Sequence, residues 1–141
     1  MVFYLLEKFL GAQKSIKSKI KIIRLIVKVM KNLAENDSKP IHHGHLQPNN
    51  ILISPDGKHV AITDLGFLFL KKYCGLFGYC NKTQYTSVEL LEEKGSVSLT
   101  INEKSDVYSM GFIMWFIISG NVPFGGLCLD SIKNFVLKYF L

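Results

Sequence analysis

The sequence predicts a mainly helical α+β fold that carries one small β-hairpin. Two β-prone runs, Ile51–Ile53 and Val60–Ile62, flank a Pro-Asp-Gly turn, where proline presets φ and glycine accepts a positive φ. Apolar residues recur at helical spacing over residues 18–36. The strongly apolar run 107–118 is too short to span a bilayer, so it predicts a buried core helix and no transmembrane segment.

The other elements follow from breaks and caps along the chain. Residues 1–13 predict a short helix after a truncated strand, and Gly11 separates them from the amphipathic helix 18–36. Pro40 ends that helix because proline cannot continue the hydrogen-bond ladder. Ser105 or Asp106 is expected to cap the apolar helix. Further helices are expected at 89–93 and 129–141.

The composition indicates one packed domain with an uneven charge. The chain has 141 residues, 48% of them apolar, and a net charge of +6. Seven cations stand in a run with no acid inside it: Lys14, Lys17, Lys19, Lys21, Arg24, Lys28 and Lys31. Such a helix face can meet an acidic partner, a membrane surface or nucleic acid, and it can equally be the solvated face of a core helix.

The cysteines predict a reducing compartment. Cys74, Cys80 and Cys128 are odd in number, and the spacing of the first two matches no common zinc pattern. We therefore expect free thiols and a cytoplasmic location. The apolar N-terminal residues lack a basic start and a small-residue cleavage site, so no signal peptide is expected.

Two stretches around the hairpin carry the functional signal. Residues 41–53 read Ile-His-His-Gly-His-Leu-Gln-Pro-Asn-Asn-Ile-Leu-Ile, and residues 62–66 read Ile-Thr-Asp-Leu-Gly. The hairpin joins them, so Asn50 and Asp64 lie at its two ends and can face a common site. Both can also be plain turn and cap residues.

The pattern resembles the catalytic core of eukaryotic protein kinases, which reads His-Arg-Asp-Leu-x-x-x-x-Asn, then a hairpin, then Asp-Phe-Gly. The matching positions are His43, Leu46, Pro48, Asn50, Asp64 and Gly66. Residues 87–89 resemble a degenerate Ala-Pro-Glu, and residues 106–124 resemble the family's central helix and the loop after it. The resemblance covers about residues 15–135 and is nearest to the tyrosine-kinase-like group.

The resemblance implies the large lobe of a protein kinase, with the small β-hairpin at the cleft and the small lobe missing. Only 41 residues precede His42, and the chain contains neither the G-x-G-x-x-G nor the Val-Ala-x-Lys of a small lobe. Residues 1–141 would then be a partial kinase-like domain, truncated at both ends. Asp106 would hydrogen-bond the backbone of the catalytic loop.

The resemblance also implies catalytic roles and defects. Asn50 and Asp64 would hold the Mg²⁺ of Mg-ATP through an amide oxygen and a carboxylate. His45 stands where the family has its aspartate base, and Gln47 stands where serine/threonine kinases have a lysine. An imidazole can accept a proton near neutral pH but lacks the carboxylate's charge, and loss of a positioned base typically costs roughly 10²–10⁴ in rate. Mg-ATP binding by this chain alone is expected to be weak or absent.

Other positions would have structural or regulatory roles. The structural set is His43, Gly66, Glu89 and Asp106. In the family the glutamate at position 89 pairs with a late arginine, and the only arginine here is Arg24. Gly44 replaces the arginine that clamps a phosphorylated activation loop. The candidate phosphorylation sites, which can also be simple packing residues, are Tyr73, Tyr79, Thr83, Tyr85, Thr86 and Ser87.

Two functions are compatible with these residues. The first is a catalytically impaired pseudokinase fragment that acts through binding or regulation, with a kinase small lobe or a signalling protein as partner. The second is part of an active ATP-dependent serine/threonine or tyrosine kinase whose small lobe lies outside this chain. No nucleic-acid partner is expected. A zinc site at His42, His43 and His45 is a further alternative, although the sequence places no fourth ligand.

Overall fold

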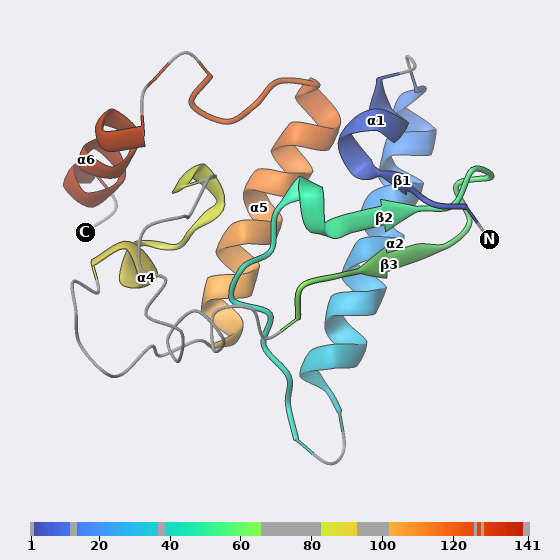
Figure 1. Ribbon diagram of the computed structural model, residues 1–141, viewed down its shortest axis with the longest axis horizontal. Helices are drawn as coiled ribbons and strands as arrows, with labels where there is room; N and C mark the ends of the chain where they lie inside the picture. Colours follow the sequence, from blue (N-terminus) through green and yellow to red (C-terminus); the bar gives the residue numbers. More distant parts are fainter. Residues whose placement is uncertain are drawn as a thin grey trace.

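The computed structural model describes residues 2–11, 14–36, 39–65, 83–92, 102–125, 127 and 129–139. The elements are β1 (Tyr4–Leu5), α1 (Leu6–Leu10), α2 (Ile16–Ala34), β2 (Ile51–Ile53), β3 (Val60–Ile62), α4 (Val88–Glu92), α5 (Glu103–Ser119) and α6 (Leu129–Tyr139). Single 3-10 turns lie at Pro48–Asn50 and Thr83–Tyr85. The predicted fold class is confirmed: the chain is mainly helical and carries a small antiparallel sheet (Figure 1).

The sheet extends the predicted hairpin by one strand. Its order is β1-β2-β3, and both pairings are antiparallel. Ile51 pairs with Ile62 and Ile53 with Val60, while Tyr4 of β1 pairs with Ile53 from the other side. A two-stranded hairpin is marginally stable in water, so the third strand and the helices behind it stabilise β2. The sheet lies on one side of α5, and α6 lies on the other (Figure 1).

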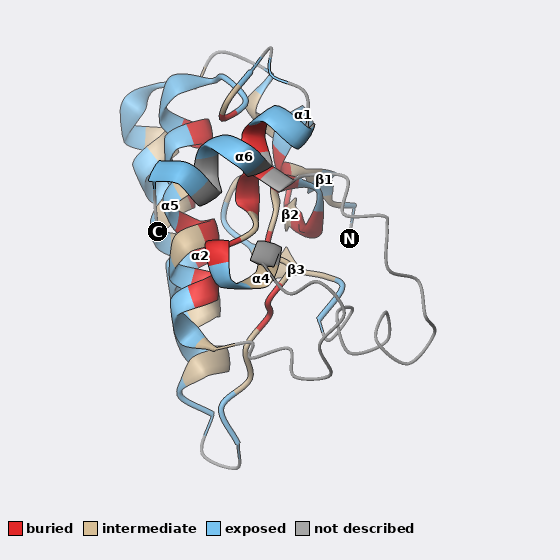
Figure 2. Cartoon of the chain, turned by 90° about the vertical axis from the view of Figure 1, so that its left-hand side faces the viewer, coloured by how far each residue is buried: buried red, intermediate tan, exposed pale blue. Residues whose placement is uncertain are grey.

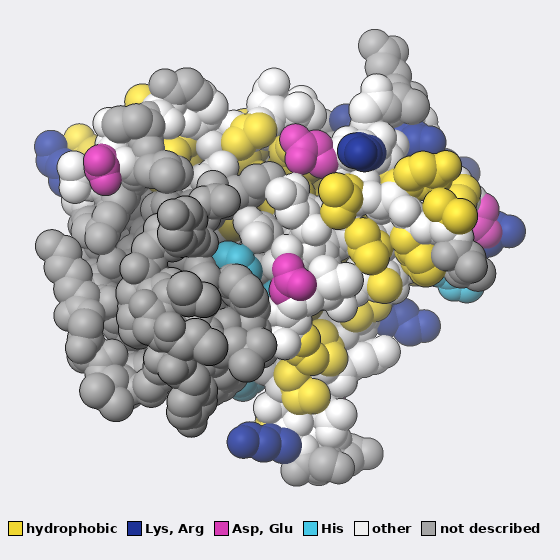
Figure 3. Space-filling model, viewed as in Figure 1, with side chains coloured by type: hydrophobic (Ala, Val, Ile, Leu, Met, Phe, Trp, Pro, Cys, Tyr) yellow, Lys and Arg dark blue, Asp and Glu magenta, His cyan; other side chains and the backbone are white. Residues whose placement is uncertain are grey.

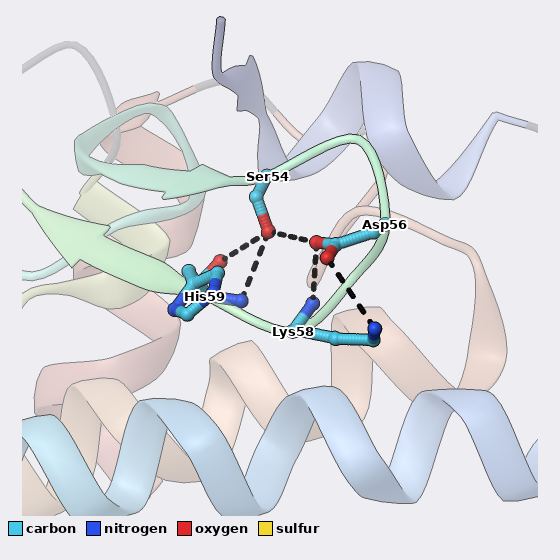
Figure 4. A network of polar contacts seen from close by, with 4 residues as sticks. All are labelled: Ser54, Asp56, Lys58 and His59. Atoms are coloured by element: carbon cyan, nitrogen blue, oxygen red, sulfur yellow. Dashed lines mark hydrogen bonds and ion pairs between the residues drawn. The ribbon is translucent and has the colours of Figure 1, made fainter. Parts of the chain in front are cut away.

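A compact hydrogen-bond network closes the hairpin turn (Figure 4). The Ser54 hydroxyl donates to Asp56 Oδ1 at 2.6 Å and accepts from the His59 backbone N–H at 2.9 Å. The Lys58 backbone N–H also donates to Asp56 Oδ1, at 3.1 Å. These bonds, that of Ser54 first, hold the pKa of the Asp56 carboxyl below its usual value. Gly57 occupies the turn position with φ 64°, which glycine adopts without steric cost.

The two long helices begin at side-chain caps. The Ser15 hydroxyl accepts from the Ser18 N–H at the start of α2. At the start of α5, Asn102 Oδ1 accepts from the N–H groups of Lys104 (2.8 Å) and Ser105 (3.2 Å). The expectation that Ser105 or Asp106 caps α5 was therefore wrong. Asn102 has the extended backbone of a capping residue, whereas the other two lie inside the helix and bond elsewhere.

The core lies where α5, α2 and β2 meet (Figure 2). Ile113 and Ile117 of α5 are fully buried there and belong to one cluster with Ile26 of α2 and Ile51 of β2. α5 is central to the core, as its sequence predicted, but only one of its sides is buried although the sequence is apolar on nearly all sides. The residues on its outer side are 39–66% exposed: Val107, Met114, Trp115 and Ile118.

None of the helices in the described ranges combines the length and apolar character that a membrane span requires.

Two tyrosines place their hydroxyl groups inside the protein. The hydroxyls of Tyr85 and Tyr108 are buried and have no hydrogen-bond partner among the described residues. Burial, with a smaller contribution from Glu7, raises the pKa of Tyr85 above its ordinary value. Burial, with a smaller contribution from Glu89, raises the pKa of Tyr108 to about 12. Both rings therefore stay neutral well into the alkaline range.

The two glycines of α5 predict opposite effects of substitution by alanine. Gly111 lies inside the helix with open space around it, so Gly111→Ala should stabilise the protein by about 0.5–1 kcal/mol. Gly120 is the C-cap with φ 76°, where a side chain is strained, so Gly120→Ala should destabilise it by roughly 1 kcal/mol. Urea unfolding measures both changes. Shifts of the same sign in the two variants would contradict this account of α5.

Tyr108 predicts a loss of stability at alkaline pH. An unfolded tyrosine loses its proton near pH ~10, whereas folded Tyr108 keeps its proton to about 12. Between these values deprotonation favours the unfolded state, so the free energy of unfolding should fall as pH rises. Urea midpoints at about pH 9 and about pH 11 should differ less in Tyr108→Phe than in the parent protein. The exposed Tyr139→Phe is the control, and an equal fall in both variants would refute the prediction.

Candidate functional site

The loop 42–50 joins α2 to β2, and a carboxylate from α5 holds it in place. The backbone N–H of His43 donates to Asp106 Oδ2 at 2.8 Å, and that of Gly44 donates to Asp106 Oδ1 at 2.7 Å. All three residues are buried. Hydrogen bonds to a buried carboxylate are short and strong, so Asp106 fixes this part of the loop to the first turn of α5. The resemblance to kinases implied this contact between Asp106 and the loop backbone.

Glycine at position 44 suits the backbone that this contact requires. Gly44 has φ 70°, in the left-handed region that most other residues adopt only with strain. The turn it makes lets two successive N–H groups point at the same carboxylate.

The His43 ring joins the loop to the end of β3. Its Nδ1 accepts the His45 backbone N–H at 3.2 Å, and its Nε2 lies 2.9 Å from the Thr63 carbonyl oxygen. Because Nδ1 accepts, the ring proton is on Nε2 and is donated to Thr63. The ring is fully buried and bonded at both nitrogens, so its role in this structure is to hold the loop against the strand.

Asn50 and Asp64 lie at the same end of the sheet. The Thr63 N–H donates to the Asn50 carbonyl oxygen at 2.9 Å, directly beyond the β2–β3 pairing. Asp64 follows Thr63 and is exposed. Its φ is 61°, a value that is uncommon outside glycine but several-fold enriched in aspartate. Strained backbone of this kind is often found at functional sites, which makes Asp64 a site candidate on structural grounds.

Gln47 connects His45 to Asn50. Its Nε2 lies 3.1 Å from His45 Nε2 and 3.4 Å from Asn50 Oδ1. The Asn50 side-chain nitrogen donates in turn to the His45 carbonyl oxygen at 2.9 Å. Turning the Gln47 amide over would set its oxygen against the Asn50 oxygen, so the amide nitrogen is the group that faces both neighbours. His45 Nε2 is then an acceptor, and its lone pair is engaged by Gln47.

Glu89 contacts α5 through a serine. The Ser105 hydroxyl donates to Glu89 Oε1 at 3.1 Å. Nearby, the Ser109 hydroxyl donates to the Tyr85 carbonyl oxygen at 2.7 Å. The segment 83–92 is thereby attached to one side of α5. Ser105 gives Glu89 a hydrogen bond, whereas the family partner expected for this glutamate is an arginine.

Some candidate residues are buried, and others lie outside the described residues. Tyr85 and Ser87 are buried, which agrees with packing rather than with ready phosphorylation. Thr86 is half-buried. Gly66, Tyr73, Tyr79 and the cysteines at 74, 80 and 128 lie outside the described residues, and Thr83 is described only by its place in the 3-10 turn Thr83–Tyr85.

The metal-binding potential is that of a small oxygen site. Within the described ranges no group of three His, Cys, Asp or Glu side chains could hold a metal ion, so the zinc alternative at the three loop histidines was wrong. Asn50 Oδ1 keeps a second lone pair beside its bond to Gln47, and Asp64 offers an exposed carboxylate. This pair suits Mg²⁺, which commonly takes one or two protein oxygens and fills its other positions with water and phosphate.

Two contributors to this site were missed by sequence reasoning. Thr63 acts through its backbone N–H and carbonyl, and backbone groups leave no signal in residue type. The Gln47 bridge was missed because position 47 was considered only for the charge it lacks.

The sequence of this chain matches a family of known proteins over most of its length. A family model described as "Protein kinase domain" matches residues 3–138. The chain belongs to the protein kinase family. The mainly helical fold with a small antiparallel sheet agrees with the large lobe of a kinase domain, as the sequence predicted.

The relatives are proteins named as serine/threonine kinases. A protein of Acanthamoeba polyphaga mimivirus, whose name describes a serine/threonine-protein kinase/receptor, is 33% identical over 85% of this kinase chain and 7% of its own length. The Lactococcus lactis protein PknB is 29% identical over 84% of this chain and 18% of its own length. The Arabidopsis thaliana kinase PEPKR2 is 33% identical over 69% of this chain and 20% of its own length. The chain thus spans about a fifth or less of these relatives, and the tyrosine-kinase-like grouping stays a prediction.

Removing the Asp106 carboxylate should destabilise the loop and the protein. Asp106→Ala leaves two buried N–H groups without their acceptor, at a cost of roughly 2–5 kcal/mol in urea unfolding. The His43 and Gly44 amides should also exchange with deuterium much faster. Asp130→Ala, an exposed carboxylate in α6, is the control and should change stability by less than about 1 kcal/mol. Unchanged amide exchange in Asp106→Ala would show that the loop is held by other contacts.

Proposed function

We propose that this kinase-family chain transfers phosphate poorly or not at all and acts by binding a protein partner. The observation that carries the proposal is the bond between Gln47 and His45 Nε2, at the place of the family's catalytic aspartate. Residues 1–141 would form part of a kinase domain, and the protein would act in the cytoplasm.

The hydrogen bond from Gln47 hinders His45 from acting as a general base. A base must have a lone pair within hydrogen-bond reach of the substrate hydroxyl. At Nε2 of His45 that lone pair already accepts an N–H from Gln47, so taking a proton there requires the bond to break. Gln47 is also neutral where serine/threonine kinases have a lysine, so it adds no positive charge to stabilise a transferring phosphate.

Mg-ATP, if it binds, would be held by Asn50 and Asp64. The ion would supply positive charge to the phosphate oxygens. Asn50 Oδ1 already accepts a hydrogen bond from Gln47, and Asp64 is the only one of the two residues with a negative charge. We therefore expect weaker binding than in a site with two carboxylates. The two residues position the ion, and His43 and Asp106 position the loop that carries Asn50.

The proposed partner is a kinase small lobe or a signalling protein. Hydrophobic side chains gather over the sheet side of the molecule (Figure 3). Val2 and Tyr4 at β1 and Leu65 after β3 are among the exposed apolar residues. Large exposed apolar areas commonly mark a protein interface.

A second candidate function is part of an active kinase whose other lobe lies outside this chain. The observation that favours it is the placement of Asn50 and Asp64 at one end of the sheet, through the bond of Thr63 to Asn50. In that case His45 or a water molecule would take the proton of the substrate hydroxyl.

The protein purified from its own cells should show no Mg·ATP-dependent phosphate transfer above that of Asp64→Ala. Transfer of radiolabelled phosphate to casein measures serine/threonine kinase activity, and transfer to a tyrosine-containing copolymer measures tyrosine kinase activity. Asp130→Ala serves as the matched control, because its carboxylate lies in α6, away from the loop.

Robust transfer that vanishes in Asp64→Ala and persists in Asp130→Ala would overturn the proposal in favour of the active kinase. His45→Ala then separates the two possible bases. A loss of roughly 10²–10⁴ in rate would assign the proton to His45, and an unchanged rate would assign it to water.

A further inference from the structure

One side of α2 carries a continuous line of positive charge. Its members, here called the basic arc, are Lys17, Lys21, Arg24, Lys28 and Lys31. Their spacing of four, three, four and three residues places them on one side of a helix. All five are exposed, and the 19 residues of α2 contain no acid.

The basic arc is poorly neutralised within this chain. In the described part of the protein, Lys31 is its one member with an ion pair, to Glu35 at 3.7 Å on the surface. Like charges on neighbouring turns destabilise a helix, and Lys17 lies near the positive end of the helix dipole. Repulsion within the arc therefore lowers the stability of α2. Acidic groups placed along the arc would remove that repulsion.

An apolar edge runs beside the arc. Ile16, Ile20 and Val27 are 42–57% exposed. Ile16 and Ile20 border the same open surface of α2 as Lys17, Lys21 and Arg24 of the arc. Val27 lines a groove of about 330 Å³ between α2 and α5.

The groove between α2 and α5 is mainly apolar and continues the edge toward α5, and the acid Glu103 of α5 lies at its side. Its walls include Met30 and Ala34 of α2 and Val107 and Met110 of α5. Lys31 of the arc also lines it. Apolar and positive side chains therefore lie side by side from the first turn of α2 to its last.

We infer that this face binds an acidic, amphipathic helix of a partner protein. The partner's carboxylates would lie along the basic arc, and its apolar residues would cover the edge and enter the groove between α2 and α5. The arc spans 15 residues, or ~21 Å of helix, which matches about four turns of a partner helix. This inference goes beyond the proposed function and holds whether or not the chain transfers phosphate.

The surroundings of the arc favour a protein over a membrane or nucleic acid. The broad apolar side of α2, with Ile22 and Ile26, is turned into the core, so α2 cannot immerse that side in a bilayer. No aromatic residue occurs in α2, and the Phe9 ring, which lines a hollow with Lys21, is already covered by the Lys14 ammonium at 4.5 Å. A helix with acids beside an apolar stripe complements both the charge and the apolar edge.

A designed peptide tests this inference. The probe is a fluorescent 20-residue helix with glutamates spaced four, three, four and three beside a leucine stripe, and anisotropy measures its binding to the full chain. Lys21→Glu, Arg24→Glu and Lys28→Glu together should weaken binding about tenfold or more. Ile20→Ser with Val27→Ser should weaken it severalfold, and added salt should weaken it further.

Matched controls separate this surface from general charge attraction. Lys39→Glu, Lys104→Glu and Lys138→Glu make the same change in net charge at exposed positions outside the arc and should leave binding nearly unchanged. A peptide of the same composition in scrambled order should bind at least severalfold more weakly. Circular dichroism checks that each variant keeps its helices.

Three results would overturn the inference. They are an equal loss of binding in the two triple variants, equal binding of the scrambled peptide, and tighter arc-dependent binding of phosphatidylserine vesicles or single-stranded DNA than of the designed helix. None of them involves nucleotide, and none of the variants changes the loop 42–50 or Asp106, so the proposed function would stand or fall separately.

Discussion

The carboxylate of Asp106 is the constraint on which the site depends. The loop residues around it have no strand or helix to satisfy their backbone groups, and buried N–H groups need partners. Asp106 supplies them from the first turn of α5, one oxygen for His43 and one for Gly44. The His43 ring then bonds to the Thr63 carbonyl oxygen. Thr63 directly precedes Asp64, so this bond also fixes the backbone next to Asp64. One buried charge thus sets the positions of residues from three separate parts of the chain.

The residues of the site divide into those that hold the loop and those that would meet a substrate. His43 and Asp106 have partners that fit a scaffold, with both ring nitrogens and both carboxylate oxygens bonded. His45 and Gln47 bond to each other. A fold can keep its architecture while its chemistry changes, because the two depend on different side chains. This division underlies the binding function proposed for the chain.

Local patterns predicted much of the fold, and tertiary contacts decided the rest. The hairpin and α2 could be predicted because a turn motif and an apolar period each act over a few residues. The cap of α5 could not, since Asn102, Ser105 and Asp106 are all good caps and distant partners claim the last two. At the site, the turn predicted that Asn50 and Asp64 can face a common site, and the structure shows the neighbour of Asp64, Thr63, bonded to the Asn50 carbonyl oxygen. The Gln47 bridge depends on side-chain rotamers that residue types do not specify.

The separation of Asp106 from the loop it holds has a consequence for synthesis on the ribosome. His43 and Asp106 are 63 residues apart in the chain. At a translation rate of about 5–20 residues per second, the loop emerges roughly 3–12 seconds before its anchor is made. During that interval α2 and the hairpin can form from local contacts, but the His43 and Gly44 amides have no carboxylate to bind. The nascent site therefore remains open to proteases and chaperones until α5 has left the exit tunnel.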